Sequence, residues 1–303
     1  MKNFFKLTCL LSLGLMLMVS CKKETPAPTA SFTAQINGGV VTFTAVVTND
    51  TKYEWDFGDG SLINTLVSPV HTYAQIAVPQ DFTVSLTIKG PGGQVTVTNK
   101  ITIPAKTKLE YLTGGKPDAP KSKKWRINQK AAFFDVTLAD ANFTSQIPSA
   151  YQIGGILASV GLANAYLDEF EFKSDGTLTI NSKGGGIFSS LAYCMGNNIP
   201  MASYYADLGL AYTKSFTTPP GATFTINEGK NLTISTPVGD VTYPNVMTIS
   251  FTKGGFFGLQ DFTSECIIKK ITDTEINAIC FYAHPKYGAK PMLALNLTFE
   301  AVK

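Results

Sequence analysis

The sequence predicts an all-β protein with two domains. Short runs of alternating apolar and polar residues recur along most of its 303 residues, and clusters of Gly, Pro, Asn and Asp separate these runs. Helical patterns are scarce: only residues 153–166 are apolar and rich in small residues, as a short helix or a buried loop would be. A chain of this length fits two domains, and we place their boundary between residues 104 and 105.

The N-terminus has the features of an exported protein. Lys2 and Lys6 precede an apolar run over residues 7–19, which is too short to span a membrane and fits a signal peptide. The run ends in Ser20-Cys21, and Lys22 follows at once. This arrangement resembles a bacterial lipoprotein signal, which implies removal of residues 1–20 and acylation of the Cys21 thiol. The alternative is an ordinary secretory signal with a chance Cys.

The Cys-Lys-Lys-Glu start of the mature chain also resembles lipoproteins of the Bacteroidetes, many of which reach the cell surface. The resemblance implies an outer-membrane lipoprotein. Two or more acyl chains on one cysteine would anchor such a protein stably. Residues 21–28 are expected to form a polar, Pro-bearing tether.

Residues 53–60, Tyr-Glu-Trp-Asp-Phe-Gly-Asp-Gly, predict a strand that ends in a tight turn. Aromatic and acidic residues alternate, as on a half-buried strand, and the glycines permit positive φ. The triplet His71-Thr72-Tyr73 and an alternating run over 82–88 follow. Together these motifs resemble the PKD domain, a small immunoglobulin-like β-sandwich, over residues 29–104. The residues that carry the resemblance are Trp55, Asp56, Gly58, Asp59, Gly60, His71 and Tyr73.

The roles expected in this first domain are structural. Asp56 and Asp59 could ligate a metal, but acids in tight turns more commonly accept hydrogen bonds from loop backbone, so we predict no metal site. The resemblance implies that His71 and Tyr73 pack the loop under the sheet, and that the domain is a spacer or an adhesion module. Strands are expected at 30–36, 40–48, 52–57, 82–89 and 95–103.

Residues 105–303 predict a larger antiparallel β-sandwich, jelly-roll-like, or a barrel. A region without clear period, 182–220, is expected to be a long loop. A Lys-Lys-Trp strand at Trp125, a hairpin at 168–176 and a closing Leu-x-Leu-x-Phe strand resemble C-terminal domains of PKD-bearing lipoproteins. This resemblance implies sugar capture beside an outer-membrane importer. Hairpins are expected at 166–181, 222–235 and 265–282, and single strands at 246–252 and 292–302.

Aromatic residues in the loops of this second domain predict a ligand site, because exposed aromatic faces hold sugars and loops commonly carry function. The alternative is that these rings fill the edge of the sandwich. We predict non-catalytic binding of carbohydrate or another surface ligand. The candidate residues are Tyr193, Tyr204, Tyr205, Tyr212, Phe256 and Phe257.

Two other classes of function stay open. Glu169 and Glu171 share one strand face about 7 Å apart, a separation that could suit the carboxylate pair of a glycoside hydrolase, although a solvated strand face is the simpler interpretation. A structural or adhesion lipoprotein with a protein partner is the third class.

Charge and cysteine content exclude further classes. Without Lys2 and Lys6, 23 basic and 22 acidic residues remain, which argues against nucleic-acid binding. Cys266 and Cys280 flank an expected turn and would lie opposite each other, so they form either a disulfide or, with Cys194, a set of buried thiols. Only two His and no C-x-x-C motif are present, so we expect neither zinc nor another cofactor.

Overall fold

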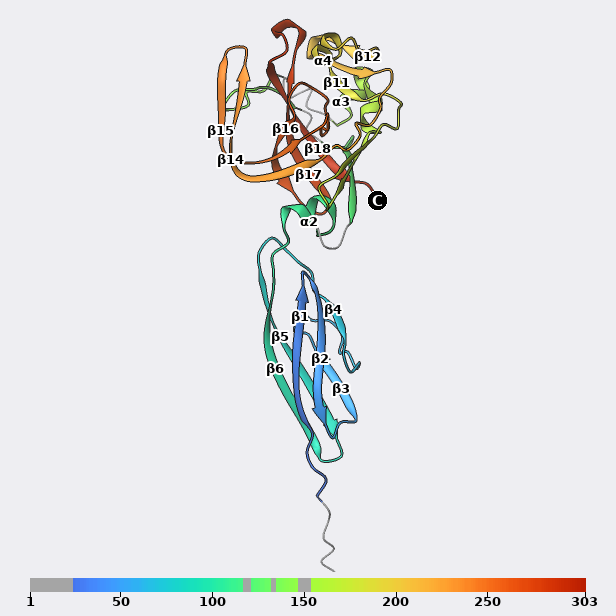
Figure 1. The fold of residues 1–303 in the computed structure, drawn as a ribbon, viewed down its shortest axis with the longest axis vertical. Helices are drawn as coiled ribbons and strands as arrows, with labels where there is room; N and C mark the ends of the chain where they lie inside the picture. The colour runs from blue at the N-terminus through green and yellow to red at the C-terminus, as the bar shows by residue number, and fades with distance from the viewer. Residues whose placement is uncertain (1–23, 117–120, 132–134, 147–153) are drawn as a thin grey trace, which may run out of the picture. The chain divides into compact units, whose positions relative to one another are not determined.

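A computed structural model describes residues 24–116, 121–131, 135–146 and 154–303, which belong to two compact units, Met1–Lys106 and Thr107–Lys303 (Figure 1). Both units consist mostly of β-strands, as the alternating patterns predict. None of the helices in these described ranges is long and apolar enough to span a membrane. The predicted signal peptide and Cys21 lie outside the described residues.

The first unit contains two three-stranded antiparallel sheets, ordered β1-β2-β4 and β3-β5-β6. Their facing sides bury an aromatic core in which Trp55 lies 5.1 Å from Phe32 and 5.4 Å from Phe43 between ring centroids. β4 was not predicted, because three residues are too few to show alternation. The strands are β1 (Thr29–Asn37), β2 (Val40–Thr48), β3 (Lys52–Asp56), β4 (Val70–Thr72), β5 (Gln80–Gly90) and β6 (Gly93–Ile103).

The turn after β3 is held by its own acids. Asp56 Oδ1 accepts a hydrogen bond from the backbone N of Gly58 (2.9 Å), and Asp59 Oδ1 accepts one from the backbone N of Ser61 (3.1 Å). Gly58 has a φ of +75°, and a Cβ there would lie 2.4 Å from the carbonyl oxygen of Thr83. Only glycine fits this close approach.

The His71-Thr72-Tyr73 triplet fastens that turn to the core. The His71 ring stacks on Phe57 at 4.0 Å, and its Nε2 lies 2.7 Å from Asp59 Oδ2. The Tyr73 hydroxyl donates to the carbonyl oxygen of Phe57 (2.9 Å). Burial would raise the pKa of Asp59, but hydrogen bonds from Ser61 and His71 and the charge of His71 lower it to about 2. These contacts hold the turn against the core of the domain, which is a structural role.

The second unit is organised around one large antiparallel sheet in the order β10-β9-β7-β18-β17-β16-β15-β14, with β8 also paired to β18. Its two ends meet: the backbone N of Leu178 donates to Ala222 O, and that of Phe224 donates to Gly176 O, both at 2.9 Å. The sheet therefore closes on itself, as in the barrel alternative. Its strands are β7 (Ser122–Ile127), β8 (Asp135–Leu138), β9 (Glu169–Lys173), β10 (Leu178–Asn181), β14 (Phe224–Thr236), β15 (Gly239–Phe251), β16 (Glu265–Ile271), β17 (Glu275–Ala283) and β18 (Pro291–Ala301).

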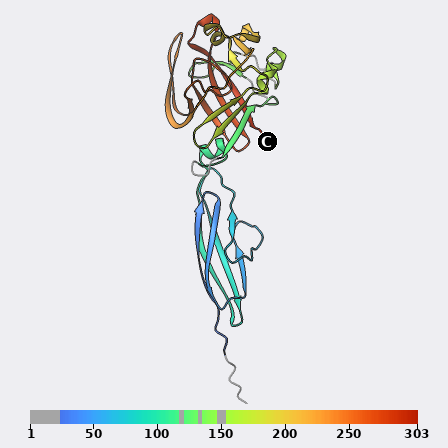
Figure 2. The same ribbon diagram turned by 45° about the vertical axis from the view of Figure 1, so that its right-hand side comes forward.

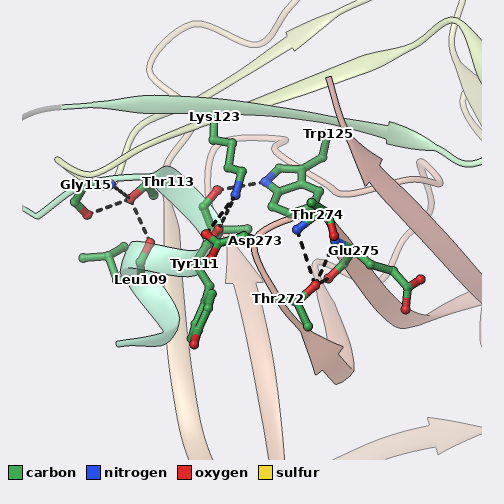
Figure 3. Close-up of polar contacts among 11 residues, drawn as sticks. Leu109, Tyr111, Thr113, Gly115, Lys123, Trp125, Thr272, Asp273, Thr274 and Glu275 are labelled. Atoms are coloured by element: carbon green, nitrogen blue, oxygen red, sulfur yellow. Dashed lines mark hydrogen bonds and ion pairs between the residues drawn. The ribbon is translucent and has the colours of Figure 1, made fainter. Parts of the chain in front are cut away.

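A short helix, α2 (Lys108–Thr113), packs at one end of this sheet. Its N-terminus is a capping box in which Thr107 and Glu110 bond each other's backbone N. The indole Nε1 of Trp125 donates to the carbonyl oxygen of Leu112 (2.8 Å), and Lys123 Nζ reaches the carbonyl oxygen of Tyr111 (3.2 Å) (Figure 3). This segment is therefore a fixed part of the unit.

Two predictions about local structure were wrong. The expected hairpin at 222–235 is one strand, β14, in which a bulge with Gly229 at φ +71° interrupts the pairing with β15. The expected long loop at 182–220 contains a small sheet ordered β11-β13-β12. Its elements, with the other short helices, are α3 (Ile156–Ser159), η3 (Ala163–Tyr166), β11 (Phe188–Ser190), α4 (Leu191–Gly196), β12 (Met201–Tyr205), η4 (Ala206–Leu208), β13 (Leu210–Thr213) and η5 (Pro285–Tyr287).

Candidate functional site

The outer face of β16, β17 and β18 is divided into two halves. In the first half, which we call the covered half, Ile267, Ile279, Phe281 and Ala294 are buried under apolar residues of the β14–β15 hairpin. Tyr243 of that hairpin lies 5.4 Å from Phe281 between ring centroids. The covered half ends where Ile279 pairs with Asn296, and from there on the outward side chains are polar.

The polar half holds a groove of about 560 Å³, which we call the amide groove. Three asparagine side chains reach it from three different segments: Asn128 after β7, Asn277 on β17 and Asn296 on β18. Lysine side chains of β16 form one side. The complete lining is Asn128, Ala131, Lys269, Lys270, Glu275, Asn277, Asn296 and Thr298.

Some polar groups of the groove have partners within it, and others do not. Asn277 Nδ2 donates to Thr298 Oγ1 (3.2 Å), and Lys270 Nζ pairs with Glu275 Oε1 (2.7 Å). Asn296 Oδ1 is buried and has no hydrogen-bond partner among the described residues. A buried acceptor without a donor costs about 1–3 kcal/mol. A ligand hydroxyl or N–H group that donates to it would recover that cost.

Three of the aromatic candidates were wrong. Tyr212, Phe256 and Phe257 are only 1–3% exposed and belong to the core of the barrel. Phe257 stacks on Phe299 at 3.8 Å, and the Tyr212 hydroxyl is bonded inside the unit. Their rings offer no face to a ligand. They fill the interior of the unit, as the alternative interpretation of these aromatic residues expects.

The other aromatic candidates lie at one end of the unit. Figure 2 shows the segment that contains α4 and β12 (yellow) at the end away from α2. Tyr204 is 61% exposed, whereas Tyr205 is half-buried against the core. Tyr193 is half-buried and packs edge-on to Phe262 at 5.1 Å. Phe262 is 43% exposed and was missed, since nothing in the sequence distinguishes it from a buried ring.

The acids of β9 do not form a free carboxylate pair. Glu169 Oε2 lies 3.6 Å from the ammonium groups of both Lys124 and Lys183. Glu171 lies directly opposite Lys124 in the β7–β9 pairing. An acid between two lysines fits a structural ion pair.

Asp168, just before β9, is a buried acid of a different kind. The Tyr212 hydroxyl lies 3.1 Å from Asp168 Oδ1 and 2.9 Å from Gly186 O, and its single hydrogen can serve only one of these acceptors. A proton on Asp168 satisfies all three groups, because Asp168 then donates to Tyr212 and Tyr212 donates to Gly186. Burial raises the pKa of Asp168 to about 8, in agreement with this arrangement.

Asp261 joins α4 to the end of β17. Its Oδ1 accepts from the Ser190 hydroxyl and from the backbone N of Ala283 (3.3 Å). Burial raises the pKa of Asp261 to about 6, although these hydrogen bonds oppose the shift. Both contacts are within the fold, so we assign Asp261 a structural role.

The three cysteines within the described residues are buried thiols. Cys266 lies directly opposite Cys280 in the β16–β17 pairing, but both are free, as is Cys194. Of the two alternatives, the structure shows buried thiols and no disulfide between Cys266 and Cys280. Cys280 Sγ lies 3.3 Å from the carbonyl oxygen of Phe257, and the neighbouring Cys280 and burial raise the pKa of Cys266 well above its usual range. Across the described ranges, no group of three or more His, Cys, Asp or Glu side chains could hold a metal ion.

Comparison with known proteins identifies the first unit. Residues 23–104 match the family model of the PKD domain, so the chain consists of a PKD domain followed by a larger antiparallel sheet region. The PKD1 domain of Vibrio anguillarum Epp is 26% identical and the PKD1 domain of the Vibrio cholerae metalloprotease PrtV is 28% identical. Each match covers 27% of this chain and 100% of that domain, with TM-scores of 0.25 and 0.23. No curated protein sequence matches this chain.

Proposed function

We propose that this chain is a lipid-anchored protein of the bacterial cell envelope whose second domain binds carbohydrate without catalysis in the amide groove. The lipid on Cys21 would hold it at the outer membrane, the PKD domain would act as a spacer, and the ligand would be a polysaccharide handed to an outer-membrane importer. The lipoprotein-like N-terminus and the resemblance to Bacteroidetes lipoproteins support the location.

The observation that carries the binding proposal is the unpartnered Asn296 Oδ1 in a groove lined by side-chain amides. Sugar hydroxyl groups both donate and accept hydrogen bonds, so they match a groove lined by side-chain amides, a hydroxyl and ammonium groups. Seven of the eight residues that line the groove carry polar or charged side chains, which suits a sugar chain better than an apolar small molecule.

The ion pairs of Glu169 with Lys124 and Lys183 favour the non-catalytic function over a glycoside hydrolase. A retaining or inverting hydrolase needs one carboxylic acid that can donate a proton and a second carboxylate facing it. The acid of β9 nearest to such a role is already engaged by two lysines.

The test is a binding screen of the full chain, purified in detergent, against plant, host and microbial polysaccharides, with product release followed in the same wells. Two variants accompany the wild type. Asn296→Leu removes the free acceptor from the groove, and Tyr204→Ala removes the exposed ring at the α4–β12 end.

Binding without product that Asn296→Leu abolishes and Tyr204→Ala preserves would support the proposal. The opposite pattern would move the site to the α4–β12 end. Product release would overturn the non-catalytic function, and silence across the panel would overturn carbohydrate binding.

A second candidate function, adhesion to a protein partner, is favoured by one observation in the PKD domain. Its β3–β4 loop is fixed by backbone bonds from Asn64 to Trp55 (3.0 Å) and from Phe43 to Pro69 (2.9 Å). It nevertheless exposes a group of apolar side chains, and such patches commonly mark protein interaction sites. The exposed residues are Leu62, Ile63, Leu66, Val67 and Val70.

A further inference from the structure

The side of the amide groove formed by β16 contains a β-bulge. Ile268 pairs with Ala278 and Lys270 pairs with Asn277, so Lys269 is an extra residue with no partner on β17. In a regular strand, Lys269 and Lys270 would point to opposite faces. The bulge breaks this alternation, and both lysines are exposed and line the groove. Bulges that redirect a side chain occur preferentially beside functional sites.

The two lysines differ in their partners. Lys270 Nζ is neutralised by Glu275 at 2.7 Å. Lys269 makes no ion pair or side-chain hydrogen bond with any residue that the structure describes. The groove is therefore lined by an ammonium group that has no ion-pair partner among the described residues, and by Asn296, whose Oδ1 accepts no hydrogen bond from them.

We propose that the amide groove binds an acidic glycan, with Lys269 pairing with a carboxylate or sulfate group of the sugar and Asn296 accepting from a neighbouring hydroxyl or N–H group. This inference rests on the proposed carbohydrate function and specifies its ligand class. Lys269 keeps the outward direction of Ile267, and the bulge adds a second lysine to the groove, because in a regular strand Lys270 would point to the inner face like Ile268.

The experiment compares polymers that differ only in charge. The full chain is titrated with polygalacturonate and with its methyl ester, and with a sulfated galactan and its desulfated form, at low and at high salt. Variants are Lys269→Gln, Lys269→Arg, and Lys52→Gln as the matched control, which removes the same charge from an exposed lysine of the PKD domain.

We expect at least one acidic polymer to bind more tightly than its neutral form, and Lys269→Gln to weaken binding of the acidic polymer roughly tenfold more than binding of the neutral form. Lys269→Arg should retain the preference, added salt should reduce it, and Lys52→Gln should have no effect. The pair that shows the preference distinguishes carboxylate from sulfate.

Equal binding of acidic and neutral polymers, or a Lys269→Gln protein with unchanged preference, would overturn the acidic-glycan inference and leave carbohydrate binding standing. Absence of binding to all four polymers would overturn the inference for these probes, and the wider panel above then decides whether carbohydrate binding fails with it.

Discussion

The covered half and the amide groove are two parts of the outer face of β16, β17 and β18, and residues that follow β7 also line the groove. The covered half is apolar, and the β14–β15 hairpin buries it. The groove half is lined by amides, a hydroxyl and charged groups, and one of its buried acceptors has no partner. The strand backbones continue from one half to the other, so the difference lies in the side chains and in the bulge at Lys269. The covered half serves stability, and we assign the other half to binding.

The largest effect that this comparison predicts is on stability in the covered half. Phe281 is 2% exposed and packs on Tyr243, so Phe281→Ala should lower the free energy of unfolding by about 3–5 kcal/mol. Urea unfolding of the full chain measures it. A loss below about 1 kcal/mol would mean that the hairpin does not hold this half of the face.

A buried polar group whose hydrogen bonds are all formed should contribute to the free energy of unfolding, unlike the Asn296 oxygen, and Asp168 is such a group. Its pKa of about 8 lies above the ordinary value of 3.8, so between these values the folded state holds a proton that the unfolded state has lost. The stabilisation is therefore complete below about pH 4 and is lost as the pH rises towards 8, by about 1.4 kcal/mol per pH unit.

Asp168→Asn keeps the hydrogen bonds and removes the titration. Unfolding of both proteins between pH 4 and 8 should show a flatter pH dependence in the variant. If the two proteins keep the same slope, Asp168 is not a protonated acid in the fold.

Asn296→Leu should abolish carbohydrate binding without lowering the stability of the fold. Removing an unpartnered buried acceptor should leave the free energy of unfolding unchanged or raise it by about 1 kcal/mol, while carbohydrate binding is lost. Thermal unfolding and binding are measured on one preparation. A clear loss of stability would show that Asn296 has a structural role.

The smallest effect is expected at the α4–β12 end. Tyr204 is 61% exposed, so Tyr204→Ala should change the free energy of unfolding by no more than about 0.5 kcal/mol. Binding should also persist, in contrast to the groove variants. Loss of binding in this folded variant would place the ligand on the exposed ring.

The sequence predicted some parts of the fold well and others poorly, and the reason is physical. The strand-turn from Tyr53 to Gly60 was predictable because alternation, glycine conformation and acid-backbone bonding all act within a few residues. Residues 182–220 were not, since strands of three to five residues show too little period. Without a period, the sequence also gave no means to tell buried Tyr212 from exposed Tyr204.

The groove was half predictable. In β18, the alternation of Leu295 and Leu297 with Asn296 and Thr298 identifies the outward side chains. Whether an outward face is covered depends on β14 and β15, which begin 67 and 52 residues before β18. The prediction had also divided β14 into two strands at Gly229. The bulge at Lys269 is defined by the pairing of β16 with β17, so the sequence of β16 alone does not reveal it.

The most direct test of the central claim follows the side-chain amide signals of the asparagines by NMR while an oligosaccharide from the best-binding polysaccharide is added. We predict that the signals of Asn128, Asn277 and Asn296 shift together, and that backbone signals of the covered half and of Tyr193 and Tyr204 stay in place. Shifts concentrated at the α4–β12 end, with the three asparagines unchanged, would contradict it.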